Sequence, residues 1–585
     1  MMIITMHRRF RMLISILPTL LAVPAFSADV SKVYDVCPRV RFIGKNPKLT
    51  QTEKKLVCGD PGMDGWKNIP LSQAQYFITS FLQQRGRYFP LFKTEDERLM
   101  VDIGTTTIVS KVTGTGLDGI YDLGKRRKIA GELLTPELLD KTKTAIIFEL
   151  QSRGYPCPRI VVTSDARTGE VRVDVDANAH YLIPPIFPPN LEGLSPGIFN
   201  RYQAFHPGDP FDIRMLSLTS DRMKQDALFL SAYYDVACSS EGLHITQRVV
   251  EAKPHMVTLG IGADTEGLVT GKMRWQESRI GENAGSAQVN LLANEQVQSL
   301  DSNLKYYMEP DSRFFIMPDA FIRREDEAPY QALHSEFSVS PGWTHDGDGY
   351  YFETRAGPAV DYFNTIVGLG PIHDTWFALD SHTTIRTHLY EFYERNPQQG
   401  WSATLDTSSR LVGADSAIAS HKLVASGESL WDLGNFAPPS AILATRGFIG
   451  TTWVPTTANV FSELPPTDRF FLGGDANVRG IPLEALPGDG TGFLTAVYDG
   501  IELRMGDVLP AGLQPFTFID AAMGAERPFH LDPDVYYSPG IGLRWATPFG
   551  SIRTTLGRGL VWRNGSPTAP PTPKWQFFFS FGKEF

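Results

Sequence analysis

The sequence FFLGGDANVRG, residues 470–480, is the stretch on which our prediction of the fold rests. Two adjacent glycines are followed, after a short polar step, by a tripeptide with one cation; these residues are Gly473, Gly474, Val478, Arg479 and Gly480. Glycine lacks a Cβ atom and so leaves the backbone free of ordinary strand geometry. The pattern predicts a loop that carries a single positive charge. A glycine-rich hairpin with a solvated arginine has the same local pattern, so the surrounding sequence must distinguish the two.

The sequence on both sides of this loop predicts β-strands. From residue 256 onward, segments in which every second residue is apolar alternate with polar or Gly/Pro-rich turns, which is typical of half-buried strands. We predict eleven strands before the loop and five after it, at residues 256–263, 268–276, 287–293, 302–308, 314–322, 333–339, 350–359, 376–388, 401–407, 421–431, 441–453, 494–505, 515–523, 540–547, 551–559 and 575–585. Sixteen is even, as closed antiparallel bacterial barrels require, and leaves about 20 residues for each strand with its turn.

The last predicted strand has large aromatic residues on one face. They are Trp575, Phe577, Phe579 and Phe581, with Phe585 at the end of the chain in the same register. Such a face would promote aggregation in water, but it suits contact with lipid. We therefore predict a 16-stranded antiparallel transmembrane β-barrel at residues 256–585, with a soluble β-sandwich as the alternative.

These motifs resemble the outer-membrane assembly and translocation superfamily, the group of BamA, TamA and the two-partner secretion transporters. The family's signature loop reads Val-Arg-Gly-Phe/Tyr, and here Ile481 stands in place of the aromatic residue. Segments similar to the family's next barrel motifs follow in order at residues 501–504, 518–524 and 538–553. The resemblance implies that loop 470–490 folds into the barrel, and that the terminal phenylalanine is a signal for assembly of the barrel.

The acidic partner that the resemblance implies for Arg479 can be selected by strand alternation. Asp520 and Phe518 share one face of their strand, so an inward Asp520 would lie beneath the folded loop. A carboxylate away from water is costly unless it is paired, and arginine offers a bidentate partner that stays protonated. We predict that Arg479 pairs with Asp520, with Glu502 as a second acceptor.

The chain before the barrel shows mixed helical and strand patterns. Segments ordered as strand, helix and two strands recur over residues 28–105, 106–179 and 180–255, including strands at 107–112 and 181–187 and helices beginning at Pro136 and Asp212. These three tandem α+β modules resemble POTRA domains, the periplasmic receptor modules of the same superfamily.

The first 27 residues read as a signal peptide, with a basic start, a short apolar segment and the cleavage site Ala25-Phe26-Ser27. All four cysteines, Cys37, Cys58, Cys157 and Cys238, precede residue 240. In an exported chain an even set can form disulfides, and Cys37 with Cys58 closes the shortest loop, although three connectivities remain open. Their spacing matches no zinc motif, so we expect no metal site.

Composition and motifs argue against several functions. The net charge of −10 disfavours a nucleic-acid partner, and no apolar run after the N-terminus is long enough for a membrane-spanning helix. We find no catalytic constellation and expect neither enzymatic activity nor a cofactor. An exported hydrolase is the alternative from the enzyme class, since Ser195 lies in a Gly-x-Ser-x-Gly spacing.

The resemblance therefore predicts an outer-membrane protein whose modules lie in the periplasm. Three modules and sixteen strands are most similar to the TamA branch, which implies assembly or translocation of unfolded outer-membrane clients, a periplasm-spanning partner subunit and contact with outer-membrane lipid. The family also implies a weak seam between the first and last strands. The alternatives are a two-partner secretion-type transporter, which would carry two modules and a plug helix, and a solute-conducting channel.

Overall fold

The computed structural model describes residues 32–60, 62–63, 69–116, 129–191, 193–311, 313–394, 397–413, 418–433, 441–454, 460–506, 508–509, 512–547, 550–563, 566–568 and 575–582. The proposed signal peptide and Phe585 lie outside these residues. The described chain forms two compact units. One holds the first module and much of the second, and the other holds the third module and the barrel.

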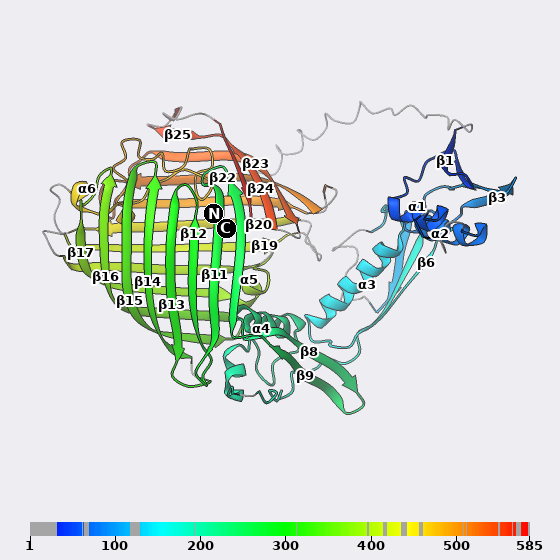
Figure 1. Cartoon of the computed structure of the whole chain (residues 1–585), viewed down its shortest axis with the longest axis horizontal. Coiled ribbons are helices and arrows are strands. Elements are labelled where there is room, and N and C mark those ends of the chain that lie inside the picture. The colour runs from blue at the N-terminus through cyan, green and yellow to red at the C-terminus, as the bar shows by residue number, and fades with distance from the viewer. Residues whose placement is uncertain are drawn as a thin grey trace, which may run out of the picture. The chain divides into compact units, whose positions relative to one another are not determined.

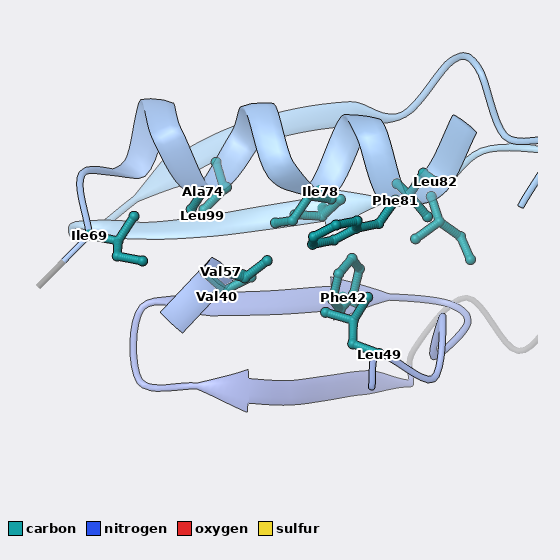
Figure 2. Packing of buried hydrophobic residues seen from close by; sticks show 12 residues of the cluster. Val40, Phe42, Leu49, Val57, Ile69, Ala74, Ile78, Phe81, Leu82 and Leu99 are labelled. Atoms are coloured by element: carbon teal, nitrogen blue, oxygen red, sulfur yellow. The ribbon is translucent and has the colours of Figure 1, made fainter. Parts of the chain in front are cut away.

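The first module is a four-stranded sheet with two helices. Its elements are β1 (Val33–Cys37), β2 (Val40–Ile43), α1 (Gln51–Cys58), α2 (Leu71–Gln83), β3 (Leu91–Glu95) and β4 (Arg98–Asp102), and the sheet order is β1-β2-β4-β3. Thr50 and Glu53 form a capping box that begins α1. Figure 2 shows α2 lying over the sheet, with Phe42, Ile78 and Leu82 fully buried between them. Apolar residues of alternate strand positions and one helix face thus make a single small core.

The second module contains β5 (Lys111–Thr115), α3 (Pro136–Gln151), β6 (Arg159–Asp165) and β7 (Glu170–Asp176), with sheet order β5-β7-β6. The Thr135 hydroxyl accepts a hydrogen bond from the Leu138 amide, 3.1 Å away, at the predicted start of the helix. The predicted strand at 107–112 was wrong in its position, because the backbone of Val109 bonds to residues 131 and 132 and the sheet strand begins only at Lys111.

The described part of the third module has one sheet, of two paired strands. It comprises the 3-10 helix η2 (Pro196–Arg201), α4 (Ile213–Gln225), β8 (Phe229–Ser239) and β9 (Gly242–Glu251). The strand predicted at 181–187 is wrong: Leu182 makes one isolated bridge, to Pro210. Four prolines at 184, 185, 188 and 189 lack the amide hydrogens that a strand ladder needs.

The described residues from β10 onward form a closed barrel, and the prediction of sixteen antiparallel strands is confirmed. The strands are β10 (His255–Asp264), β11 (Leu268–Ile280), β12 (Gly285–Ala293), β13 (Val297–Tyr307), β14 (Phe314–Glu327), β15 (Tyr330–Gly347), β16 (Tyr350–Val367), β17 (Asp374–Thr387), β18 (Gly400–Gly413), β19 (Ser420–Asp432), β20 (Ala441–Trp453), β21 (Thr495–Met505), β22 (Leu513–Ala525), β23 (Val535–Thr547), β24 (Gly550–Gly557) and β27 (Gln576–Phe581). Figure 1 shows them side by side around the wall. A short hairpin that we did not predict, β25 (Leu560–Arg563) and β26 (Ser566–Thr568), extends from β23.

Alternation along the strands separates an apolar exterior from a polar interior. On β22, Ile519 is 48% exposed whereas its neighbours Phe518 and Asp520 are buried, and on β27 Phe577 is exposed whereas Phe578 is buried. The aromatic residues at 575 and 577 thus face outward, as expected of a lipid-facing wall. No helix in the described part of the chain has the length and apolar character needed to cross a bilayer.

Candidate functional site

The segment between β20 and β21 packs against the inner wall of the barrel. It contains α6 (Val460–Glu463) and η3 (Pro466–Asp468), and isolated bridges join Phe470 to Phe493 and Leu472 to Leu486. Leu472, Val478 and Ile481 are fully buried in a common core. The loop therefore has an apolar core of its own and is not a solvated hairpin.

The glycines of the loop answer two steric requirements. Gly473 and Gly474 have φ angles of 118° and 96°, in a region that favours glycine. The side-chain oxygen of Asn477 accepts hydrogen bonds from the amides of Gly473 and Val478, at 2.6 and 2.7 Å. A Cβ atom on Gly480 would lie 2.3 Å from the Gly559 nitrogen, so only glycine allows the loop to come this close to the backbone that follows β24.

The loop places Arg479, which is fully buried, against two carboxylates on neighbouring strands. Its Nε and Nη2 atoms donate to the two oxygens of Asp520, at 2.8 and 2.6 Å, and its backbone amide donates to Asp520 at 3.1 Å. Its Nη1 atom donates to Glu502 on β21. The ring of Phe518 lies beneath the guanidinium, with 3.6 Å between the guanidinium carbon and the ring centroid. We call Arg479, Glu502 and Asp520 the Arg479 cluster.

Ile481 stands at the position where the related family has an aromatic residue. Its side chain is fully buried and packs in the loop core with Leu472 and Val478. The aromatic contact of the arginine comes from Phe518 on the barrel wall instead. Replacement of the family's ring by an aliphatic residue therefore leaves the arginine with an aromatic neighbour.

Two further arginines, for which no role was predicted, also bind Glu502 of the Arg479 cluster. Glu502 also accepts from Nε of Arg504 on the same strand and from Nη2 of Arg553 on β24, each at 3.0 Å. Both arginines are buried. Arg504 could have been found from its spacing, because it is two residues from Glu502 and so shares its face. Arg553 had no local signal.

The base of the loop is held by a second group of charges that the sequence analysis missed. Asp468 in η3 forms an ion pair with Arg410 on β18 and accepts a hydrogen bond from the Ser420 hydroxyl at 2.8 Å. Arg410 also binds Asp361, whose other oxygen lies 2.6 Å from Nε2 of His334. Charge pairs therefore fix the loop at its base and at its tip.

In the described chain, the potential metal-ligand atoms of His334, Glu336 and Asp361 lie close enough together to hold one ion. Asp361 is already bonded to Arg410 and to His334. A cation beside a guanidinium would meet electrostatic repulsion, so the donor set of these residues does not favour a metal.

The tip of the loop also reaches both sides of the place where the barrel closes. Among the described residues, β10 pairs with β27 through Ala263 with Phe581 and Asp264 with Ser580, and the Thr265 amide donates to the Phe579 carbonyl at 3.0 Å, whereas ten residue pairs join β10 to β11. The amide of Asp475 donates to Glu266, in the turn after β10, at 2.9 Å. On the other side, the carboxylate of Asp475 lies 3.7 Å from Arg553 of β24. A cavity of about 410 Å³ adjoins this tip.

At the opposite end of the strands, the third module is joined to the barrel through buried charges. Nε and Nη2 of Arg222 on α4 donate to the two oxygens of Glu391, at 2.8 and 2.7 Å, and Nη1 donates to Asp346 at 2.5 Å. Glu391 lies in α5 (His388–Phe392), a helix between β17 and β18 that we did not predict. Burial raises the pKa of Glu391, but the hydrogen bonds and charge of Arg222 outweigh burial and hold this pKa below its usual range.

The remaining predicted residues lie outside this site. The cysteines pair as Cys37–Cys58 and Cys157–Cys238, and the described chain has no free cysteine. Ser195 caps η2, where its hydroxyl lies 3.4 Å from the Gly197 amide.

Comparison with known proteins gives the following matches. Residues 393–585 match the Omp85 superfamily domain. BamA from Haemophilus ducreyi lacking POTRA domains 1–3 is 14% identical, with a TM-score of 0.47 over 81% of this chain and 99% of that one. CdiB from Acinetobacter baumannii is 13% identical, with a TM-score of 0.43 over 81% and 89%, and CdiB from Escherichia coli is 12% identical, with a TM-score of 0.42 over 82% and 90%.

Proposed function

We propose, from the premise that residues 393–585 form an Omp85 superfamily domain within an outer-membrane barrel, that this protein assembles or translocates other outer-membrane proteins. In this proposal the α+β modules lie in the periplasm and receive unfolded clients. The barrel then passes these clients into or across the membrane. The role is mechanical, without an enzymatic step or a cofactor.

The observation that carries the proposal is the buried Arg479 cluster. A pore for solutes needs a polar lumen, but it has no evident need for a loop fixed by a fully buried guanidinium between two strands. Here the loop tip contacts the turn after β10 and also β24, so it braces the closure of the barrel, where two residue pairs join β10 to β27 among the described residues. This arrangement supports a barrel whose closure is controlled, as lateral release of a client would require.

The three modules favour a TamA-like assembly factor over a two-partner secretion-type transporter, which is the nearest alternative. That alternative would carry two modules and a plug helix at the N-terminus. A solute-conducting channel is the alternative from another class. A periplasm-spanning partner subunit would dock on the modules, and the exposed apolar wall would contact outer-membrane lipid.

The proposal can be tested by depletion in the native cell. We expect selected outer-membrane β-barrel proteins to disappear from the membrane fraction, and a plasmid copy to restore them. The Arg324→Ala variant should restore them as well, because it removes an exposed arginine of the barrel. The Arg479→Ala variant should not. Large, steady conductance of the purified protein in planar bilayers, together with normal client assembly after depletion, would establish a solute channel instead.

A further inference from the structure

A polar cavity lies where the third module meets the barrel, beside the contact between Arg222 and Glu391. Its volume is about 180 Å³. The module contributes Arg201 at the end of η2, and the barrel contributes Lys305 of β13, Glu353 of β16 and Arg386 of β17. The cavity thus has walls from two structurally separate parts of the same compact unit.

The guanidinium of Arg201 is buried without a hydrogen-bond acceptor. Its Nε, Nη1 and Nη2 atoms are each buried and have no hydrogen-bond partner among the described residues. The group stacks on the ring of Tyr307, with 3.8 Å between the guanidinium carbon and the ring centroid. Stacking stabilises the charge through the face of the guanidinium and leaves the N–H groups at its edge unused.

Arg386, also in the lining of the cavity, is only partly paired. Its Nη2 atom donates to Glu391 at 3.3 Å and its guanidinium carbon lies 5.0 Å from the centroid of the Tyr351 ring, but its Nε atom is buried without a hydrogen-bond partner among the described residues. Four guanidinium nitrogens of these two lining residues therefore lack an acceptor in the described part of the chain. Buried donors without partners cost free energy, typically about 1–3 kcal/mol each.

The carboxylates that line the cavity are already engaged by other donors. Glu353 accepts from Lys305 at 3.2 Å and from the Tyr351 hydroxyl at 2.8 Å. Glu391 accepts from Arg222 and Arg386, and Asp226 accepts from the Tyr202 hydroxyl at 2.9 Å. Donors are in excess in this cavity, so the complementary ligand carries negative charge and several acceptor oxygens.

The structure assigns to this cavity a binding site for a phosphate-type oxoanion, held by Arg201 of the third module and Arg386 of the barrel. Arginine matches this ligand because its planar fork binds two oxygens of one phosphate at once. A volume of about 180 Å³ exceeds the roughly 30 Å³ that one water occupies in the liquid and accommodates one such group. The bound anion bridges module and barrel, and so strengthens the contact that Arg222 makes beside it.

The test is calorimetric titration of inorganic phosphate into the full-length protein in detergent micelles, with chloride at matched ionic strength as the control anion. We expect saturable binding of phosphate and none of chloride. The Arg201→Gln variant should weaken phosphate binding at least tenfold. The matched control is Arg323→Gln, because Arg323 is also stacked on a ring, that of Phe321, but lies near Asp301 and Glu325. This control should bind phosphate within twofold of the parent protein.

Heat-modifiable migration on gels shows for each variant whether the barrel is folded, and Arg386→Gln provides a second, independent variant that should also weaken binding. Titration with a short-chain phosphatidic acid distinguishes a lipid headgroup from free phosphate as the ligand. If either ligand binds the parent protein and this binding is lost in Arg201→Gln, the site is upheld, and the ligand that binds more tightly is its source of phosphate. Absence of phosphate binding to the parent protein, or equal affinity of the folded Arg201→Gln variant, would overturn the assignment.

Discussion

Replacement of Arg479 by alanine should release the loop from the barrel wall. Arg479 donates four hydrogen bonds in the cluster, three of them to Asp520. The backbone amide remains in the variant, but the loss of both side-chain donors leaves Asp520 with the Tyr498 hydroxyl at 3.2 Å as its other donor. Removing one partner of a buried ion pair costs about 3–5 kcal/mol.

The lower part of that range applies here, because Glu502 keeps Arg504 and Arg553 as partners. A cost of about 3 kcal/mol raises the population of released loop by about two orders of magnitude. Lysine at this position keeps the charge but not the bidentate geometry, so Arg479→Lys should increase release by roughly tenfold. Asp520→Asn should resemble the lysine variant, because Arg479 retains Glu502.

The assay is the rate of maleimide labelling of a cysteine introduced at Val478, which is fully buried in the closed loop. The native cysteines do not interfere, because they form two disulfides. Labelling reports the released population when the loop reopens and closes faster than the reagent reacts. The Arg324→Ala variant is the control and should label at the parent rate. If Arg479→Ala also labels at the parent rate in a barrel that is still heat-modifiable, the cluster does not hold the loop and our reasoning is wrong.

Three further predictions concern the modules. Arg222→Ala should speed amide hydrogen exchange in α4 at least tenfold, because it leaves Glu391 and Asp346 buried without their shared cation. Lys224→Ala on the same helix should not speed this exchange. Equal exchange in both variants would show that the contact between module and barrel does not depend on the charge of Arg222. A Cys157→Ser and Cys238→Ser double variant removes the Cys157–Cys238 disulfide, which joins residues 81 positions apart. On the chain-entropy model this loss should lower the free energy of unfolding by about 4.5 kcal/mol, and an unchanged denaturant midpoint would contradict this prediction. Hydrogen bonding from Arg85 holds the pKa of Glu53 below its ordinary 4.5. This bond therefore stabilises the first module above pH 4.5, and its contribution is lost as the pH falls through the folded-state pKa. The acid unfolding of α1, followed by hydrogen exchange, should lose this pH-dependent component in Glu53→Gln, and an unchanged acid unfolding would contradict the assignment.

The barrel could be predicted from the sequence because its information is local. A strand with one face toward an apolar phase has to alternate, and sixteen such segments recur whatever their neighbours are. The same alternation put Asp520 on the inner face of β22, where the structure has it. Helix starts were local too, as the Thr135 hydroxyl at the beginning of α3 shows.

The charge pairs between distant elements could not be predicted in the same way. Arg410 and Asp468 are 58 positions apart, and Arg222 and Glu391 are 169 apart. No periodicity links such residues, since their meeting depends on how strands close and where a module docks. The wrong prediction of a strand at residues 181–187 in the third module has a different cause. The apolar pattern of this segment predicted a strand, but its prolines lack the amide hydrogens that would pair it with a neighbouring strand.

The position of the Arg479 cluster explains why this loop is held by charges and not only by apolar packing. Apolar residues of similar volume often stabilise a protein as well as a buried ion pair does, so stability alone does not account for the cluster. Fixed geometry accounts for the cluster, because the guanidinium can donate to all of its carboxylate acceptors in only one position of the loop. That position sets Asp475 against Glu266 on one side of the barrel closure and against Arg553 on the other. Among the described residues two pairs join β10 to β27, so a loop displaced by a few ångströms would leave the closure without this brace. Under the proposed function, the cluster is a positional lock, and its release would accompany the opening of the barrel.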